Sequence, residues 1–184
     1  VESPLFIESE RLAPFNPRGS DVAVVLDLMI HDIDLVLTLT KAKVTQVSAA
    51  GVGVLTPSVD IADARLGFAN GAIANITASR ISRERTRKLR LFQRNGYMSL
   101  DLGAGNGELF RLRKDVDLAA LAQQAQPDVA AFVERIPLEA PDGDALRLEL
   151  ESFVAAVRGE SPVPVTGDDG RDALAVALQI VADI

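Results

Sequence analysis

The fold of this chain is organised around the stretch Asp21-Val-Ala-Val-Val-Leu-Asp-Leu-Met-Ile-His-Asp-Ile-Asp-Leu-Val-Leu-Thr-Leu-Thr40. It contains the only histidine of the chain, His31, among mostly apolar residues. At the helical step of about 100° per residue, four of its polar residues fall on one stripe roughly 60° wide: Asp27, His31, Asp34 and Thr38. Surface helices usually have a polar cylinder with a narrow apolar stripe. We therefore expect a helix that is buried on most sides and has one polar edge facing water or a cleft.

The loop before this helix predicts where the helix begins. Residues 14–20 are rich in Pro and Gly, and they end in Ser20, which continues the polar stripe. Serine is a favoured N-cap residue, and the negative charge of Asp21 in the first turn favours a helix start. The sequence therefore predicts a helix N-cap at Ser20 and Asp21.

In the sequence before and after this helix, apolar residues alternate with a period of two, which predicts β-strands. Asn-Gly pairs at 70–71 and 95–96 are typical of tight turns between antiparallel strands. Such a sheet must bury one face, and the helix over residues 21–40 is the expected partner for that face. The expected strands cover residues 5–13, 44–54, 60–68, 72–82, 88–93, 97–101, 108–113 and 135–139.

The C-terminal third of the chain predicts helices. Residues 118–125 favour a short helix within a polar, Ala- and Gln-rich segment. An amphipathic helix is expected from Ala145 to Arg158, ended by Gly159, with one apolar face formed by Leu146, Leu150, Phe153, Val154 and Val157. A closing helix is expected from Arg171, with Ala173, Ala177 and Ile180 along one side.

Composition limits the classes of function. The chain has 184 residues, 48% hydrophobic and 24% charged, which fits one globular domain. Its net charge of −7 disfavours binding to nucleic acid or to anionic membranes, and no membrane segment or secretory leader is visible. The absence of cysteine excludes disulfides and fits a cytoplasmic protein. Because the sequence starts at Val1 and stops at Ile184 inside an apolar helical pattern, we expect a fragment of a longer protein.

Asp27 and His31 are four residues apart, so on a helix their side chains are neighbours. A carboxylate beside an imidazole can orient it and stabilise its charged form, which suits general acid–base catalysis. The alternative is a core histidine with Asp27 as its structural partner. The spacing by itself leaves both interpretations open.

Other candidate sites are weaker. The basic run from Arg80 to Arg94 could bind a phosphate or carboxylate, or it could form a solvated face of a hairpin. The glycines at 51–53 and 103–107 do not complete a dinucleotide-binding fingerprint, so we interpret them as turns and bulges. One histidine with scattered aspartates predicts no metal site, and no Ser or Cys nucleophile stands in a recognisable context.

The segment Asp27-Leu-Met-Ile-His31-Asp-Ile-Asp34-Leu, followed by strands with Phe68-Ala-Asn-Gly71-Ala and Thr77-Ala-Ser-Arg80, resembles the C-terminal domain of the glucose–fructose oxidoreductase / inositol dehydrogenase (Gfo/Idh/MocA) family. The resemblance covers the whole chain. It implies an α+β fold, similar to the C-terminal domain of glyceraldehyde-3-phosphate dehydrogenase. In that fold an open-faced, largely antiparallel sheet carries a long buried helix and flanking helices on one face.

The resemblance also implies a function. Family members are two-domain oxidoreductases that use NAD or NADP and act on sugars, polyols or sugar derivatives. Transferred to this sequence, His31 is expected to be the general base and Asp27 to hold the substrate or the imidazole. Arg18 and Arg80 are expected to contact an anionic substrate. The stretch Glu8-Ser-Glu-Arg-Leu-Ala-Pro-Phe15 is similar to a bacterial subgroup that oxidises nucleotide-linked amino sugars.

The sequence also departs from the family. It lacks a Rossmann domain and the Glu-Lys-Pro segment whose lysine normally shares the active site. We therefore expect residues 1–184 to be one substrate and oligomerisation domain that neither binds NAD(P) nor turns over substrate alone, the longer parent being the enzyme. A homodimer or higher homo-oligomer is expected. The alternative function is a non-catalytic dimerisation module that uses the open sheet face.

Overall fold

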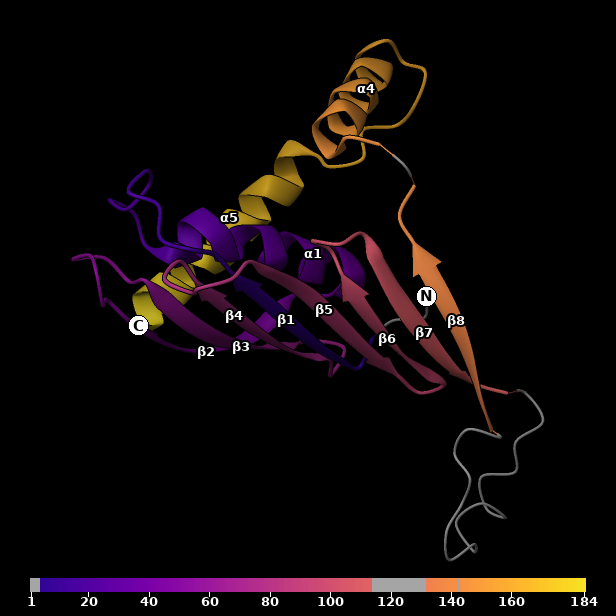
Figure 1. Ribbon diagram of the computed structural model, residues 1–184, viewed down its shortest axis with the longest axis horizontal. Coiled ribbons are helices and arrows are strands. Elements are labelled where there is room, and N and C mark those ends of the chain that lie inside the picture. Colours follow the sequence, from indigo (N-terminus) through magenta and orange to yellow (C-terminus); the bar gives the residue numbers. More distant parts are fainter. Residues whose placement is uncertain (1–3, 114–131, 142) are drawn as a thin grey trace, which may run out of the picture.

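The computed structural model describes residues 4–113, 132–141 and 143–184, which form a sheet with helices on one face (Figure 1). The sheet has eight strands in the order β2-β3-β4-β1-β5-β6-β7-β8. This architecture confirms the predicted open-faced α+β fold. The strands are β1 (Phe6–Leu12), β2 (Val44–Val52), β3 (Ile61–Phe68), β4 (Ile73–Ser79), β5 (Thr86–Gln93), β6 (Gly96–Asp101), β7 (Asn106–Leu112) and β8 (Val133–Glu139).

β1 is the element that makes the sheet mixed. It lies between β4 and β5, parallel to β4 with Phe6 opposite Ile73, and antiparallel to β5 with Phe6 opposite Phe92. All other neighbouring strands pair in the antiparallel sense. Because the parallel strands β1 and β4 end at the same edge of the sheet, the loops that follow them are neighbours.

The central helix is shorter than predicted. It starts with a π-helical turn, η1 (Val25–Met29), which continues as α1 (Ile30–Thr40). The N-cap position belongs to Val24, so the prediction of Ser20 as N-cap was wrong. The hydroxyl of Ser20 instead donates to the carbonyl of Pro17, 2.8 Å away, in a turn that precedes the helix. Lys41 ends the helix in the left-handed conformation (φ 50°).

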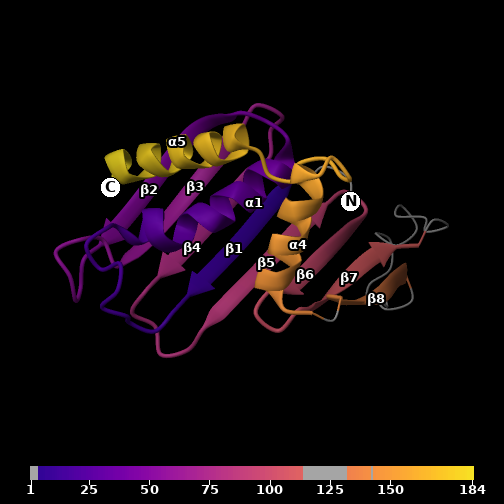
Figure 2. The same ribbon diagram turned by 90° about the horizontal axis from the view of Figure 1, so that it is seen from above.

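The core lies between the sheet and two helices, α1 and α5 (Gly167–Asp183). Figure 2 shows both helices above β2, β3, β4 and β1. Thr166 and Asp169 form a capping box at the start of α5, each side chain accepting from the other residue's backbone N–H. The helix expected to be buried on most sides is thus buried only where η1 and α1 pack inward, and its other residues are half-buried or exposed. The buried apolar residues of these helices are Val25, Met29, Ile33 and Val36, and Ala173, Val176, Ala177 and Ile180.

The helix α4 (Ala145–Val157) forms where the sequence predicted it, with Asp144 as N-cap and Gly159 (φ 74°) directly after its C-cap. None of its residues is buried, and it stands away from the sheet in Figure 1. The last predicted strand is confirmed as β8, whereas the helix predicted over 118–125 lies outside the described residues. No helix within the described part of the chain has the length and apolarity needed to cross a membrane.

Candidate active site

The candidate site lies at the sheet edge where β1 and β4 end and the central helix begins. The loop after β1 is held to the loop after β4 by backbone hydrogen bonds, from Ala13 N–H to Ser79 O (2.8 Å) and from Ser82 N–H to Ala13 O (3.0 Å). The N–H of Val24 donates to the carbonyl of Val59, 2.8 Å away, in the loop between β2 and β3. Three loops therefore surround the start of the helix.

Asp27 and His31 occupy different segments of this helix. Asp27 is half-buried in η1, and a side chain at Gly19 would begin 3.6 Å from its Oδ1, so the preceding loop folds over the carboxylate. His31 is exposed in the first turn of α1. Among the described residues no hydrogen bond links these two side chains. Both groups are thus able to meet a ligand rather than each other. π-helical turns occur often at functional sites, where they shift side chains relative to a regular helix.

The other half of the predicted polar stripe has a different setting. Asp34 and Thr38 line a hollow of about 690 Å³ between the C-terminal half of α1 and the N-terminal half of α5. Its walls also carry Lys41, Asp169 and Asp172. The stripe therefore divides into a pair beside the loops, Asp27 and His31, and a pair beside α5.

Asp32, the residue after His31, connects the helix to the sheet. It is only 2% exposed, and its Oδ1 accepts from the Ser9 hydroxyl at 2.8 Å and from Arg11 Nη2 at 3.3 Å. Arg11 Nε forms an ion pair with Asp32 Oδ2. Sequence reasoning missed this group. The pattern that could have revealed it is β1 itself, where Ile7, Ser9 and Arg11 alternate onto the core face, so that two polar residues point toward the helix.

Arg80 is one of the predicted ligand contacts, and it lies in the interior with 3% of its surface exposed. Its Nη1 donates to Gly19 O (2.8 Å), and its Nη2 donates to Val59 O (2.8 Å) and also to Val22 O. These bonds hold the loop before the helix and the loop between β2 and β3 together. A direct role of Arg80 in ligand binding stays a prediction, while its position within the protein is that of a loop-organising residue.

Asp60 balances the charge of Arg80 and was also missed. Its Oδ1 lies 3.2 Å from Arg80 Nε, and its Oδ2 accepts from three successive backbone N–H groups, those of Val54, Leu55 and Thr56, at 2.7–2.9 Å. Burial raises the pKa of Asp60, but the hydrogen bonds from Val54, Thr56 and Leu55 outweigh it and hold the pKa well below its usual range. The carboxylate is therefore ionised throughout the ordinary pH range.

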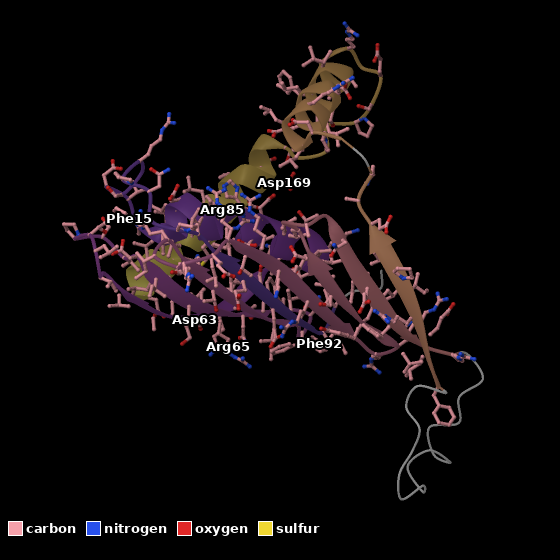
Figure 3. The ribbon with its side chains drawn as sticks, in the orientation of Figure 1. Phe15, Asp63, Arg65, Arg85, Phe92 and Asp169 are labelled. Atoms are coloured by element: carbon pink, nitrogen blue, oxygen red, sulfur yellow. The ribbon has the colours of Figure 1, made fainter. Side chains whose placement is uncertain are left out.

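The remaining arginines of the basic run separate onto two faces. Arg83 and Arg85 are exposed in the loop after β4, and Arg18 is exposed in the loop after β1. In the part of the chain that the structure describes, no carboxylate pairs with any of these three side chains. Arg90 points to the opposite, open face of the sheet, where it contacts Glu8 at 3.2 Å. Figure 3 shows Phe15 and Arg85 on the helix side of the sheet and Asp63, Arg65 and Phe92 on the open face.

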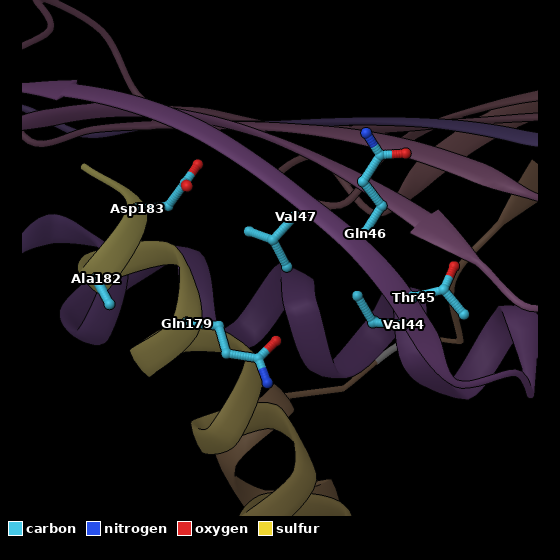
Figure 4. Close-up of a pocket in the computed structure, with 7 residues that line it drawn as sticks. All are labelled: Val44, Thr45, Gln46, Val47, Gln179, Ala182 and Asp183. Atoms are coloured by element: carbon cyan, nitrogen blue, oxygen red, sulfur yellow. The ribbon is translucent and has the colours of Figure 1, made fainter.

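A further shallow pocket lies at the edge of the sheet, away from the candidate residues. Figure 4 shows it between β2 and α5, lined by Val44, Thr45, Gln46, Val47, Gln179, Ala182 and Asp183. The carboxylate of Asp183 accepts from the outward N–H of Ala49 at 2.6 Å. Because this bond occupies a donor of the edge strand, α5 protects β2 from pairing with another strand. No three His, Asp or Glu side chains of the described residues gather in a way that could hold a metal ion.

Known proteins resemble this chain over the region that holds the candidate site. The family model of the GFO/IDH/MocA C-terminal domain matches residues 10–99, which include the candidate site. UDP-N-acetylglucosamine 3-dehydrogenase from Acidithiobacillus ferrooxidans is 38% identical over 178 residues, covering 97% of this chain and 54% of that protein. The chain therefore spans about half the length of the curated relative that it matches.

Solved structures resemble the fold over its full extent. The structure of the same A. ferrooxidans dehydrogenase superposes with a TM-score of 0.84 at 36% identity, covering 99% of this chain and 55% of the other. A levoglucosan dehydrogenase in complex with NADH superposes with a TM-score of 0.77 at 13% identity, covering 100% of this chain and 57% of the other, which shows likeness of fold alone. The chain belongs to the GFO/IDH/MocA family and forms the C-terminal domain of that family.

Proposed function

We propose that this chain is the substrate-binding and catalytic half of an NAD(P)-dependent dehydrogenase that acts on a sugar, a polyol or a nucleotide-linked sugar. The observation that carries the proposal is the exposed His31 at the start of α1, one helical turn after the half-buried Asp27, whose carboxylate lies against Gly19 of the loop after β1. The family membership and the 38% identity to a UDP-N-acetylglucosamine 3-dehydrogenase support this reaction class. We place the protein in the cytoplasm, with which its lack of cysteine is compatible.

The cofactor is expected to bind elsewhere in a longer protein. The described residues offer no strand, Gly-rich turn and helix in the arrangement that binds a dinucleotide, so they do not fit NAD(P) by themselves. In the proposed enzyme an N-terminal domain binds NAD or NADP, whose nicotinamide accepts the hydride. The 184-residue chain alone is then inactive. Tight binding of NADH in a titration of this chain would contradict the proposal that a separate domain binds the cofactor.

His31 and Asp27 supply the proton chemistry in this proposal. The imidazole of His31 takes the proton from the substrate hydroxyl at which oxidation occurs. Asp27 has no hydrogen bond to His31 within the described residues, so we assign it to a substrate hydroxyl rather than to the imidazole. The ion pair between Arg11 and Asp32 fixes the helix under His31, so that the imidazole keeps its position during the reaction.

The proposed substrate class is a nucleotide-linked amino sugar, as the name of the A. ferrooxidans relative suggests. Such a substrate carries a diphosphate, which arginine binds through paired N–H donors. Arg18 is exposed near the helix start and is free in the described structure to make this contact. Arg80 would contribute indirectly, because it holds the carbonyls of Gly19 and Val22 in the loop that carries Arg18.

The test is His31→Asn in the full-length protein, with Thr38→Ala as the control on the same helix. We expect the turnover number with UDP-N-acetylglucosamine and NAD or NADP to fall about 10²- to 10⁴-fold for His31→Asn, because positioned proton transfer typically contributes that much. The control should stay within a few-fold of wild type. Turnover of His31→Asn within a few-fold of wild type would remove His31 from the base role.

A second candidate function is assembly through the open sheet face. Four aromatic rings form a continuous row across β1, β5, β6 and β7 on that face: Phe6 to Phe92 at 5.9 Å, Phe92 to Tyr97 at 4.8 Å, and Tyr97 to Phe110 at 5.8 Å. Aromatic residues are enriched at protein interfaces. A homodimer that buries this row would fit both the catalytic proposal and a purely structural role.

Sedimentation of the chain tests the assembly proposal. We expect a dimer for wild type and a monomer for Phe92→Asp, whereas Phe15→Asp should remain dimeric because Phe15 is exposed on the helix side. Circular dichroism identifies any variant that fails to fold. A wild-type monomer at high micromolar concentration would contradict a strong dimer through this face.

A further inference from the structure

The apolar face of α4 is exposed along its whole length. Leu150, Phe153 and Val157 are 56%, 65% and 71% exposed, and none of the thirteen residues of the helix is buried. The apolar residues Leu146, Leu150, Phe153, Val154 and Val157 project onto a stripe about 100° wide. This is the width of stripe with which a helix packs on a core. A continuous apolar surface of this kind marks an interaction site.

Charged residues line both edges of this apolar stripe. Arg147 and Glu151 form an i,i+4 ion pair 2.7 Å long along one edge, where Arg158 also lies, and Glu149 lies at the other edge. An isolated helix of this length is marginal in water, because helices shorter than about 12–15 residues depend on packing. The charged residues thus keep the edges of the stripe in water, and the apolar stripe itself has no partner among the described residues.

The position of α4 limits what can cover its apolar face. α1 and α5 cover β2, β3, β4 and β1, whereas α4 projects over β5 and β6 in Figure 2 but stands away from the sheet in Figure 1. On the neighbouring strands β7 and β8, Leu109, Ile136 and Leu138 are only half-buried. The A. ferrooxidans structure matches 99% of this chain, including α4, and the match accounts for only 55% of that protein. About half of the relative therefore lies outside the shared domain, and α4 offers an uncovered apolar surface for it.

We propose that the apolar face of α4 is the docking surface for the cofactor-binding domain of the full-length protein. This inference rests on the proposed function, since it assumes that such a domain exists. Leu146, Leu150, Phe153, Val154 and Val157 would pack against an apolar surface of that domain, so that α4 sets the distance between the nicotinamide and His31. The contact would be part of a stable inter-domain interface rather than a passing encounter.

The experiment compares Leu150→Asp with Leu148→Asp in the full-length protein and in the 184-residue chain. Leu148 is also exposed, but it lies about 160° around the helix from Leu150, so it is a matched control for charge and helix propensity. In the full-length protein we expect Leu150→Asp to be cleaved between its domains at least about tenfold faster by a protease, because a charge is placed in the interface. Leu148→Asp should be cleaved like wild type.

The 184-residue chain separates the possible occupants. If the partner is the cofactor domain, neither variant changes the unfolding midpoint of this chain or its sedimentation. A loss of stability in the short chain for Leu150→Asp would show that α4 packs on its own domain, and a shift from dimer to monomer would show that a second copy covers it. Either result would overturn the proposal, as would wild-type cleavage of full-length Leu150→Asp.

Proteolysis and unfolding do not depend on catalysis, so the two proposals fail separately. A full-length protein with faster cleavage of Leu150→Asp but no dehydrogenase activity would retain the docking surface and reject the proposed function. A full-length protein with dehydrogenase activity and unchanged cleavage of this variant would reject the docking surface alone.

Discussion

Arg11 of β1 forms a buried ion pair with Asp32 of α1, the residue that follows His31 in the chain. Their side chains are 11% and 3% exposed, and Ser9 donates a further hydrogen bond to the carboxylate. Because the pair joins the centre of the sheet to the helix, it determines how the first turn of α1 sits. The position of the candidate base, His31, therefore depends on this ion pair as well as on apolar packing.

Arg11→Leu should destabilise the domain by about 3–5 kcal/mol, because Asp32 would remain as a buried charge without a partner. Denaturant unfolding measures the change. The control is Arg90→Leu, which removes the exposed pair with Glu8 and should cost about 0–1 kcal/mol. Equal losses in both variants would show that burial does not govern the strength of the Arg11 pair.

Asp27→Asn in the full-length protein should lower kcat/KM roughly 10- to 100-fold, the equivalent of about 1.5–3 kcal/mol for a hydrogen bond to a charged group. The matched control is Asp34→Asn, which removes the same charge from the same helix beside the hollow near α5. Steady-state kinetics with the nucleotide sugar measures both. A comparable loss in the control would mean that net charge, not the position of Asp27, is responsible.

The lowered pKa of Asp60 predicts acid sensitivity. In the unfolded chain the carboxyl takes up a proton near its ordinary pKa of 3.8, whereas in the folded protein it stays ionised to a much lower pH. Its contribution to stability is therefore complete above about pH 5 and is lost progressively as the pH falls below 4. Urea unfolding at pH 7 and pH 3 should show a smaller loss for Asp60→Asn, which is already destabilised at pH 7, than for wild type. An equal loss in both proteins would assign the acid sensitivity to other carboxyl groups.

Arg80→Ala should unfold more easily by about 3–5 kcal/mol, because Asp60 loses its counter-charge and three carbonyl oxygens lose a donor. Thermal unfolding of the 184-residue chain measures this effect. Arg83→Ala, a change of an exposed arginine in the loop after β4, serves as the control and should stay within about 0.5 kcal/mol of wild type. Unchanged stability in Arg80→Ala would mean that the two loops keep their places without it.

Arg18→Ala separates substrate binding from stability. The exposed side chain should leave the unfolding midpoint unchanged but raise KM for a nucleotide sugar about tenfold or more in the full-length protein, since a charged hydrogen bond contributes about 1.5–3 kcal/mol. KM for an uncharged sugar, if one is turned over, should not change. Equal KM values for the nucleotide sugar in variant and wild type would remove Arg18 from the site.

Local structure was largely predictable from the sequence. The strand alternation located the strands of the described residues to within a few residues, and Gly159 and the Asn-Gly turn at 70–71 stand where the backbone needs a positive φ. The start of the central helix was the local exception. Ser20 has the chemistry of an N-cap, but Arg80 holds Gly19 and Val22 in a turn, and the helix begins only afterwards.

The sequence indicated which residues form the candidate site but not which parts of the fold surround them. The composition of one stretch singled out Asp27 and His31, and the regular 100° step placed Asp34 and Thr38 beside them. The packing of α5 beside Asp34 and Thr38 gives these two residues surroundings different from those of Asp27 and His31. The burial of Arg80 could not be inferred, because its partners come from residues 21 to 61 positions away along the chain.

The sequence by itself determined which segments form strands and helices, which helix faces are apolar, and which residues are available for proton chemistry. These properties depend on side-chain periodicity and on hydrogen bonds between close neighbours in the chain. Only the tertiary structure decided that β1 inserts between β4 and β5, that Asp32 pairs with Arg11, that Arg80 and Asp60 organise the loops, and that no part of the described chain buries the apolar face of α4. Those outcomes depend on which distant segments share one interior, because a buried charge or polar group must find its partner wherever the fold brings one.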